Sequence, residues 1–102
     1  MANYKIRVES EALQDIQEAT DWYNKQLHGL GSRFQKQVKA QINALKKNPL
    51  GYGIRYANVR CVMVNKFPFL VHFTIDEAQK LVEVFAIYHT SRNPEIWLQR
   101  NK

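Results

Sequence analysis

Apolar and polar residues alternate at the start of the chain, and Tyr4, Ile6 and Val8 fall on one side. A period of two is typical of a strand that buries one face. After Val8 the apolar spacing changes to three and four, which is typical of an amphipathic helix. Ser10 is expected to cap this helix. Its buried stripe is expected to consist of Ala12, Ile16, Ala19, Tyr23 and Leu27.

A second apolar stripe at helical spacing follows a glycine-containing break at residues 28–31. The break predicts a short loop, and Pro49 predicts the end of the second helix. Two helices joined by so short a loop are expected to pack as an antiparallel hairpin. The stripe consists of Leu30, Phe34, Val38, Ile42 and Leu45.

The second half of the chain has apolar runs of β type at residues 59–64, 70–75 and 81–89, separated by short turns. Short turns join antiparallel neighbours, so these runs predict a three-stranded meander, while residues 50–57 are expected to be a loop. Asn93 and Pro94 favour the start of a short C-terminal helix. The sequence thus predicts an α+β fold of order β-α-α-β-β-β-α, with the hairpin on one face of the sheet.

The bulk composition narrows the class of protein. A chain of 102 residues is the size of one domain, so residues 1–102 are expected to form a single domain. One cysteine excludes an internal disulfide and favours a reducing, cytoplasmic setting. No apolar run approaches the roughly 20 residues of a membrane span, and no secretory signal is expected at the N-terminus.

The positive charge is unevenly distributed. The net charge is +6, and no acidic residue occurs between Asp21 and Asp76. A basic block without acids predicts a positive face whose partner is a nucleic acid or an acidic protein. The basic residues of this block are Lys25, Arg33, Lys36, Lys39, Lys46, Lys47, Arg55, Arg60 and Lys66.

Polar and cationic residues gather where the last predicted strand ends. His89 and Arg92 follow the apolar run, and Trp97 lies one turn into the next helix. His89 is the best candidate for acid–base chemistry, because imidazole exchanges protons near neutral pH; the alternative is a strand-end histidine bonded to backbone. Arg92 is expected to bind phosphate or carboxylate.

Arg60 has two open interpretations. It shares a predicted strand face with Val62 and Val64, so it either binds an anion at the rim of the sheet or pairs with an acid such as Glu83.

The remaining candidates are expected to be structural. His72 and Cys61 alternate within strands, and Trp22 lies beside the helix stripe, so packing roles are expected for all three. No metal-ligand spacing and no glycine-rich phosphate loop is present, so no cofactor or metal is expected.

The whole pattern resembles the RelE/ParE superfamily of bacterial toxins, often described as plasmid-stabilisation proteins. The matching pieces are the opening strand, the helix from Phe34 to Leu45, Arg60 on the next strand and residues 67–69 before a β run. The C-terminal segment from Ile87 to Arg100 completes the resemblance, which covers nearly the whole chain.

This resemblance implies the toxin of a type II toxin–antitoxin module. A cognate antitoxin with an acidic, amphipathic C-terminal segment is expected to lie against the helical hairpin and the sheet. RelE-like members cut messenger RNA on the ribosome, and ParE-like members poison DNA gyrase. An inactive toxin remnant is a further alternative.

The departures from the RelE-like pattern favour the ParE-like alternative slightly. Arg60 matches the first strand cation of RelE-like members, but Val62 and Phe69 stand where further cations are expected, and Trp97 falls near the expected tyrosine. If the chain is a ribonuclease, the resemblance makes His89, Arg60 and Arg92 its catalytic residues. A surface that binds target or antitoxin is expected to include Arg60, Lys66, Arg92, Trp97 and Arg100.

Overall fold

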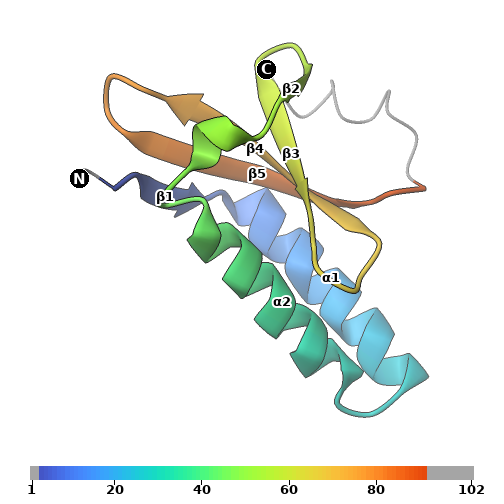
Figure 1. Ribbon diagram of the computed structural model, residues 1–102. Coiled ribbons are helices and arrows are strands. Elements are labelled where there is room, and N and C mark those ends of the chain that lie inside the picture. The colour runs from blue at the N-terminus through green and yellow to red at the C-terminus, as the bar shows by residue number, and fades with distance from the viewer. Residues whose placement is uncertain (1–2, 92–102) are drawn as a thin grey trace.

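A computed structural model describes residues 3–91 of the chain (Figure 1). Five strands, two α-helices and one short 3-10 helix follow one another in these residues. In chain order they are β1 (Lys5–Val8), α1 (Ser10–Gln26), α2 (Leu30–Ala44), η1 (Pro49–Gly51), β2 (Ile54–Tyr56), β3 (Val59–Met63), β4 (Phe69–Asp76) and β5 (Leu81–His89).

All strands belong to one sheet of order β1-β5-β4-β3-β2. The predicted meander is confirmed, since β3, β4 and β5 pair antiparallel. The first strand joins the sheet in parallel with β5, placing Lys5 opposite Leu81 and Val8 opposite Val84. Strand β1 is therefore an edge strand that connects the first and last parts of the described chain.

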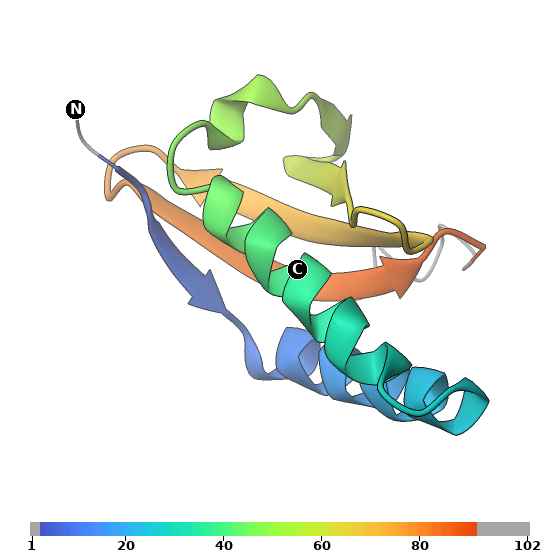
Figure 2. The ribbon, with the colours of Figure 1, turned by 60° about the horizontal axis from the view of Figure 1, so that its bottom comes forward.

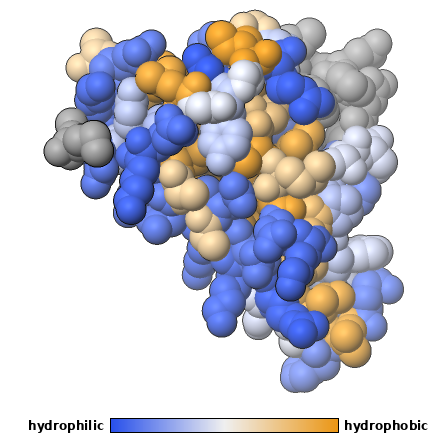
Figure 3. Space-filling model, viewed as in Figure 1, coloured by the Kyte–Doolittle hydropathy of each residue, from blue (hydrophilic) through white to orange (hydrophobic). Residues whose placement is uncertain are grey.

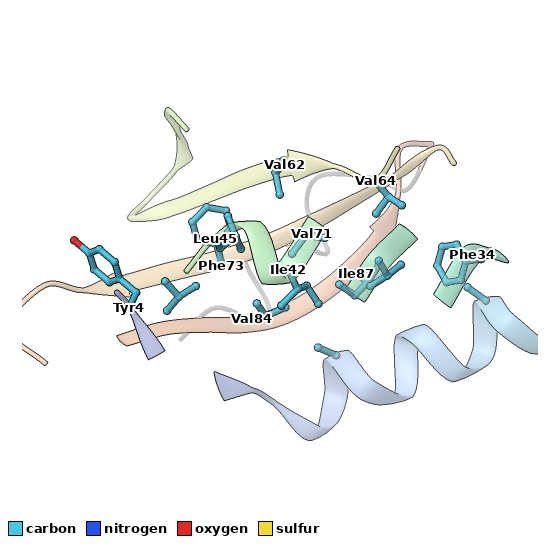
Figure 4. Packing of buried hydrophobic residues seen from close by; sticks show 14 residues of the cluster. Tyr4, Phe34, Ile42, Leu45, Val62, Val64, Val71, Phe73, Val84 and Ile87 are labelled. Atoms are coloured by element: carbon cyan, nitrogen blue, oxygen red, sulfur yellow. The ribbon is translucent and has the colours of Figure 1, made fainter. Parts of the chain in front are cut away.

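Both helices cover the same face of the sheet, and α2 runs across it in Figure 2. The α+β layer arrangement is confirmed. The core between the layers combines the stripe of α2 with residues from β3, β4 and β5, as Phe34, Ile42, Val71 and Val84 illustrate (Figure 4). Phe34, Val71 and Val84 have no solvent exposure, so this layer provides most of the hydrophobic stabilisation.

The loop between the helices permits an unusually close crossing. Gly29 has a φ of 90°, a left-handed conformation that glycine adopts without strain. A Cβ on Gly31 would lie 2.4 Å from the Thr20 carbonyl oxygen of α1. The Gly31 N–H also donates to Asn24 Oδ1 at 2.8 Å, so this crossing depends on glycine at position 31.

The predicted meander is also extended by a strand that the sequence did not indicate. Residues 50–57 were expected to be a loop, but Ile54–Tyr56 pairs with β3. The turn between the two strands includes Ala57, whose φ is 47°. Apolar and polar residues do not alternate clearly in this glycine-containing segment. Its strand conformation therefore depends on pairing with β3 more than on its own sequence.

The expected ends of α1 are wrong. Glu9, rather than Ser10, occupies the N-cap and makes no side-chain cap hydrogen bond. The Glu9 N–H donates to the Val84 carbonyl, so the backbone stays extended through Glu9. At the other end α1 stops at Gln26, and Leu27 is 59% exposed instead of buried.

Trp22 is likewise on the surface. Its side chain is 57% exposed and contacts Tyr23 edge-on, with ring centroids 5.1 Å apart. The expectation that Trp22 packs in the core is therefore wrong. Neighbouring residues on a helix point about 100° apart, and Tyr23 is the one that reaches the core.

Strand β5 contains a bulge that changes which of its side chains point toward the helices. His72 pairs with Ala86, but Phe73 pairs with Val84, so Phe85 is an extra residue. The alternation therefore slips, and Val84 and Ile87 both face the helices although they are three residues apart. Leu70, Ala86 and Tyr88 form a second apolar cluster with Tyr56, Cys61 and Phe85.

The predicted C-terminal helix falls outside the described residues. The same holds for Arg92, Trp97 and Arg100, so their assigned roles stay predictions.

Candidate functional site

His89 ends β5 directly after the buried residues Ile87 and Tyr88. Its Nδ1 accepts a hydrogen bond from the Ser91 backbone N–H at 3.0 Å and lies 2.7 Å from Ser91 Oγ. The backbone-bonded alternative considered for this histidine is thus present in the structure. The ring also contacts Phe69 edge-on, with centroids 5.1 Å apart.

A small apolar cleft of about 300 Å³ opens beside His89, between the end of β5 and α1. Burial raises the pKa of the Tyr23 hydroxyl, so this group stays neutral at physiological pH. Among residues 3–91 no Lys or Arg lines the cleft, so its described lining is suited to apolar contact with a partner better than to stabilising a charged transition state. Its lining residues are Ala19, Trp22, Tyr23, Pro68, Phe69 and His89.

Arg60 lies far from this cleft. Arg60 pairs with Phe73 on β4, whereas His89 pairs with Phe69, so the two positions differ by four residues along β4 and two strand spacings across the sheet. With usual strand dimensions this separates their Cα atoms by about 16 Å. The arrangement does not bring Arg60 and His89 to one reacting phosphate, which acid–base and cationic groups must both touch.

Arg60 has a local partner instead. Its guanidinium donates a hydrogen bond to the Tyr52 backbone carbonyl after η1. The expected alternative partner, Glu83, forms an ion pair with Arg7 across β1 and β5, with Arg7 Nη1 3.2 Å from Glu83 Oε2. The interpretation of Arg60 as a partner of Glu83 is therefore wrong, and its hydrogen bond fixes the loop before β2.

Lys66 lies in the turn between β3 and β4, close to α2. It lines a cleft of about 480 Å³ together with Arg33 and Lys36, which were expected only as part of the basic block. The turn is tied to α2 by Asn65, whose Nδ2 lies 3.5 Å from Gln37 Oε1. The fold thus brings Lys66 close to two cations that precede it by thirty residues or more in the sequence.

An apolar groove of about 1030 Å³ lies between the β1 edge and the two helices. We call it the β1 groove. Leu13, which lines it, is 55% exposed although it is a large apolar residue. The apolar lining consists of Tyr4, Ile6, Val8, Leu13, Ile16 and Ile42, and the basic residues are Lys5, Lys39 and Lys46.

Sequence reasoning missed the β1 groove, although it contained a signal. Lys39 lies three residues before Ile42, and Lys46 lies four residues after it, just beyond the end of α2, so cations border an apolar position. The groove itself requires the parallel pairing of β1 with β5, which no local pattern indicates.

The outer face of the sheet holds a buried polar cluster around His72. His72 has no exposed surface, and its Nδ1 lies 3.0 Å from Tyr56 Oη and 3.5 Å from Cys61 Sγ. Burial raises the pKa of the Cys61 thiol to about 11 and also raises that of the Tyr56 hydroxyl. Both groups are therefore neutral at pH 7, and Cys61 is poorly suited to act as a nucleophile.

Residues 3–91 were also searched for groups that could hold a metal ion and for helices that could span a membrane. Residues 3–91 contain no group of three or more His, Cys, Asp or Glu residues that could hold a metal ion. Within the same residues, neither helix combines the length and apolar character that a membrane span requires.

Comparison with known protein families identifies the family of this chain. Residues 6–94 match the family described as the ParE toxin of the type II toxin–antitoxin system, parDE. The chain belongs to the ParE toxin family. It is a type II toxin, and a cognate antitoxin is the partner that this family membership gives it. No curated protein matches its sequence.

Solved structures resemble this ParE-family chain in fold at low sequence identity. A chain of the chromosomal ParDE system from P. aeruginosa superposes with a TM-score of 0.77 at 15% identity, covering 86% of this chain and 97% of that one. A chain of the RelBE2 toxin–antitoxin complex from Mycobacterium tuberculosis gives 0.60 at 16% identity, with 90% and 97% covered. The isolated E. coli RelE toxin gives 0.64 at 14% identity, with 94% and 93% covered.

Proposed function

We propose that this toxin stops bacterial growth in the cytoplasm by binding DNA gyrase. The separation of Arg60 from His89 is the observation that carries the proposal, because metal-free RNA cleavage needs both kinds of group at one phosphate. The apolar cleft beside His89 offers contact area for a protein target instead. Trp22 is its most exposed large residue and the best anchor, since tryptophan often dominates binding energy.

Induction of the chain in growing bacteria without an antitoxin tests the target. We expect growth arrest with intact RNA 5′ ends, together with inhibition of DNA supercoiling by purified gyrase. New RNA ends at fixed codon positions would favour the ribosome-dependent ribonuclease instead, with His89, Arg60 and Arg92 as its residues. Unimpaired growth at full expression of the folded chain would identify an inactive remnant.

Two variants separate these outcomes further. His89→Ala should weaken growth arrest only in part if gyrase is the target, because the cleft loses one of its lining side chains, and should abolish it if His89 is the acid or base of a ribonuclease. Trp22→Ala should weaken gyrase inhibition roughly tenfold or more, as truncation of an anchoring tryptophan does. Leu50→Ala is the matched control, because Leu50 is also an exposed apolar residue but lies outside the cleft.

We also propose that the antitoxin occupies the β1 groove with an acidic, amphipathic C-terminal segment. The apolar floor fits the apolar side of such a segment, and Lys5, Lys39 and Lys46 complement its carboxylates. Strand β1 adds an edge that can pair with an extended part of the same segment.

Binding of the antitoxin encoded beside the toxin gene, or of its C-terminal peptide, tests this groove. Leu13→Glu should weaken binding at least tenfold, because it places a carboxylate on the floor beside an acidic ligand. Lys39→Glu with Lys46→Glu should act in the same direction. Arg33→Glu with Lys36→Glu is the matched control, since it makes the same charge change elsewhere on α2; equal losses in both double variants would contradict the proposed position.

A further inference from the structure

Three cations converge where the β3–β4 turn approaches α2. Arg33 and Lys36 lie one turn apart on the helix, and Lys66 faces them from the turn across a cleft of about 480 Å³. Figure 1 shows the turn beside the first half of α2, and hydrophilic side chains cover much of this part of the surface in Figure 3. We call this site the Lys66 cleft.

Within residues 3–91, no acidic side chain forms an ion pair with the cations of the Lys66 cleft. Among residues 3–91, Arg7 with Glu83 is the ion pair that forms, and none involves Arg33, Lys36 or Lys66. The first turn of α2 contains no acidic residue either. The positive end of the helix dipole thus adds to the field of the three side chains.

The cleft is also held in shape. Asn65 contacts Gln37 across it, and Phe67 packs against Phe34 and Tyr23, with ring centroids 5.3 Å and 5.1 Å apart. Lys66 has a φ of 70°, a left-handed conformation that is typical of tight turns. Lys66 is therefore presented by a turn that is packed against the core, and Arg33 and Lys36 are presented by α2.

The chemistry of the lining distinguishes between the possible polyanions. Leu30 and Phe67 are the two apolar residues of the cleft, and both are only partly exposed. An amphipathic acidic peptide needs an apolar floor, and the lining of this cleft is less apolar than that of the β1 groove. A phosphodiester backbone needs closely spaced cations and little apolar surface.

We propose that the Lys66 cleft binds the phosphodiester backbone of a nucleic acid. This inference does not depend on gyrase as the target or on the position of the antitoxin. Arg33 offers a guanidinium fork for phosphate oxygens, while Lys36 and Lys66 add point charges on either side. No base-specific contact is implied, so binding should depend on salt more than on sequence.

The test measures binding of a labelled 12-nucleotide single strand and a 12-base-pair duplex to the purified chain at several salt concentrations. The test variant combines Arg33→Gln, Lys36→Gln and Lys66→Asn; asparagine suits the positive φ at position 66. The control combines Lys46→Gln, Lys47→Gln and Arg55→Gln, exposed residues outside the cleft that remove the same charge. Circular dichroism verifies that both variants remain folded.

We expect the test variant to lose about tenfold or more in affinity at low salt, and its salt dependence to fall by roughly two counterions. The control should lose less than about threefold. Equal losses in the two variants would overturn the proposal, because binding would then reflect net charge alone. It would also be overturned if neither nucleic acid binds at low salt while an acidic peptide binds in the cleft.

Discussion

A single side chain can accept a backbone hydrogen bond that no neighbouring strand accepts, and Asp15 does so in this protein. The pairing of β1 ends near Val8, so the edge of β5 beyond Val84 has no neighbouring strand among residues 3–91. Asp15 of α1 takes over there, and its Oδ2 accepts the Ile87 N–H at 3.0 Å. One carboxylate thus joins the helix layer to the sheet.

Asp15→Ala should lower the free energy of unfolding by about 2 kcal/mol, because it leaves a buried N–H without its charged acceptor. Glu18→Ala is the control, since Glu18 is exposed on the same helix. Urea unfolding of both variants measures the difference. A loss no larger than that of the control would show that water replaces the carboxylate.

The Cys61 thiol gives the fold a pH dependence. Its pKa rises from an ordinary 9.0 to about 11 in the folded chain, chiefly through burial. Between these values the unfolded chain releases the proton before the folded chain does, so the free energy of unfolding should fall as pH rises from about 9 to 11. Urea unfolding at pH 8 and pH 10 checks this.

Cys61→Ala should reduce that fall without abolishing it. The pKa of Tyr56 is raised in the same cluster and gives a decline of the same sign above its ordinary value of 10.0. A Cys61→Ala curve identical to that of the original chain would rule out the thiol as a source of the dependence.

At the scale of elements, the helical hairpin relies on one close approach. Gly31→Ala should lower the free energy of unfolding by about 1–3 kcal/mol, because the added methyl would meet the Thr20 carbonyl. Gly53→Ala is the matched control: nothing lies within 4 Å of its Cβ position. Thermal unfolding compares the two, and equal midpoints would mean that the helices separate freely.

Elements with a strong period could be predicted, and elements defined by distant partners could not. The stripe from Phe34 to Ile42 specifies α2 by its own spacing, and its burial follows. Strand β2, the bulge at Phe85 and the extended Glu9 depend on pairing with other strands, so local sequence carries little trace of them. His89 could be identified from its position at the end of a predicted strand. The Lys66 cleft could not be predicted, because it forms only where the β3–β4 turn approaches α2 in the folded chain.

At the scale of the whole molecule, α2 separates two kinds of surface. Lys39 lines the β1 groove, and with about 100° per residue it lies about 60° around α2 from Lys36 and about 120° from Arg33, so the two surfaces are on neighbouring sides of the helix. Apolar recognition and charge recognition are therefore divided between two sides of one helix.

A toxin bound to an acidic antitoxin peptide should consequently still bind an oligonucleotide. We expect affinity in the saturated complex to differ from that of the free chain by less than about threefold at moderate salt, because the two sites share no lining residue and salt screens the carboxylates of the peptide. Anisotropy measured with and without peptide tests this. Direct competition would mean that the antitoxin also covers the Lys66 cleft.

The parallel pairing of β1 with β5 also bears on synthesis of the chain. The Arg7 and Glu83 side chains, which meet across these strands, are 76 residues apart. Such a distant contact forms late, since a long loop must close first. On the ribosome, β1 is synthesised before β5, so the β1 groove is completed only after β5 has emerged and paired with β1. A nascent chain that is interrupted before residue 81 lacks β5, and therefore has neither the complete sheet nor that groove.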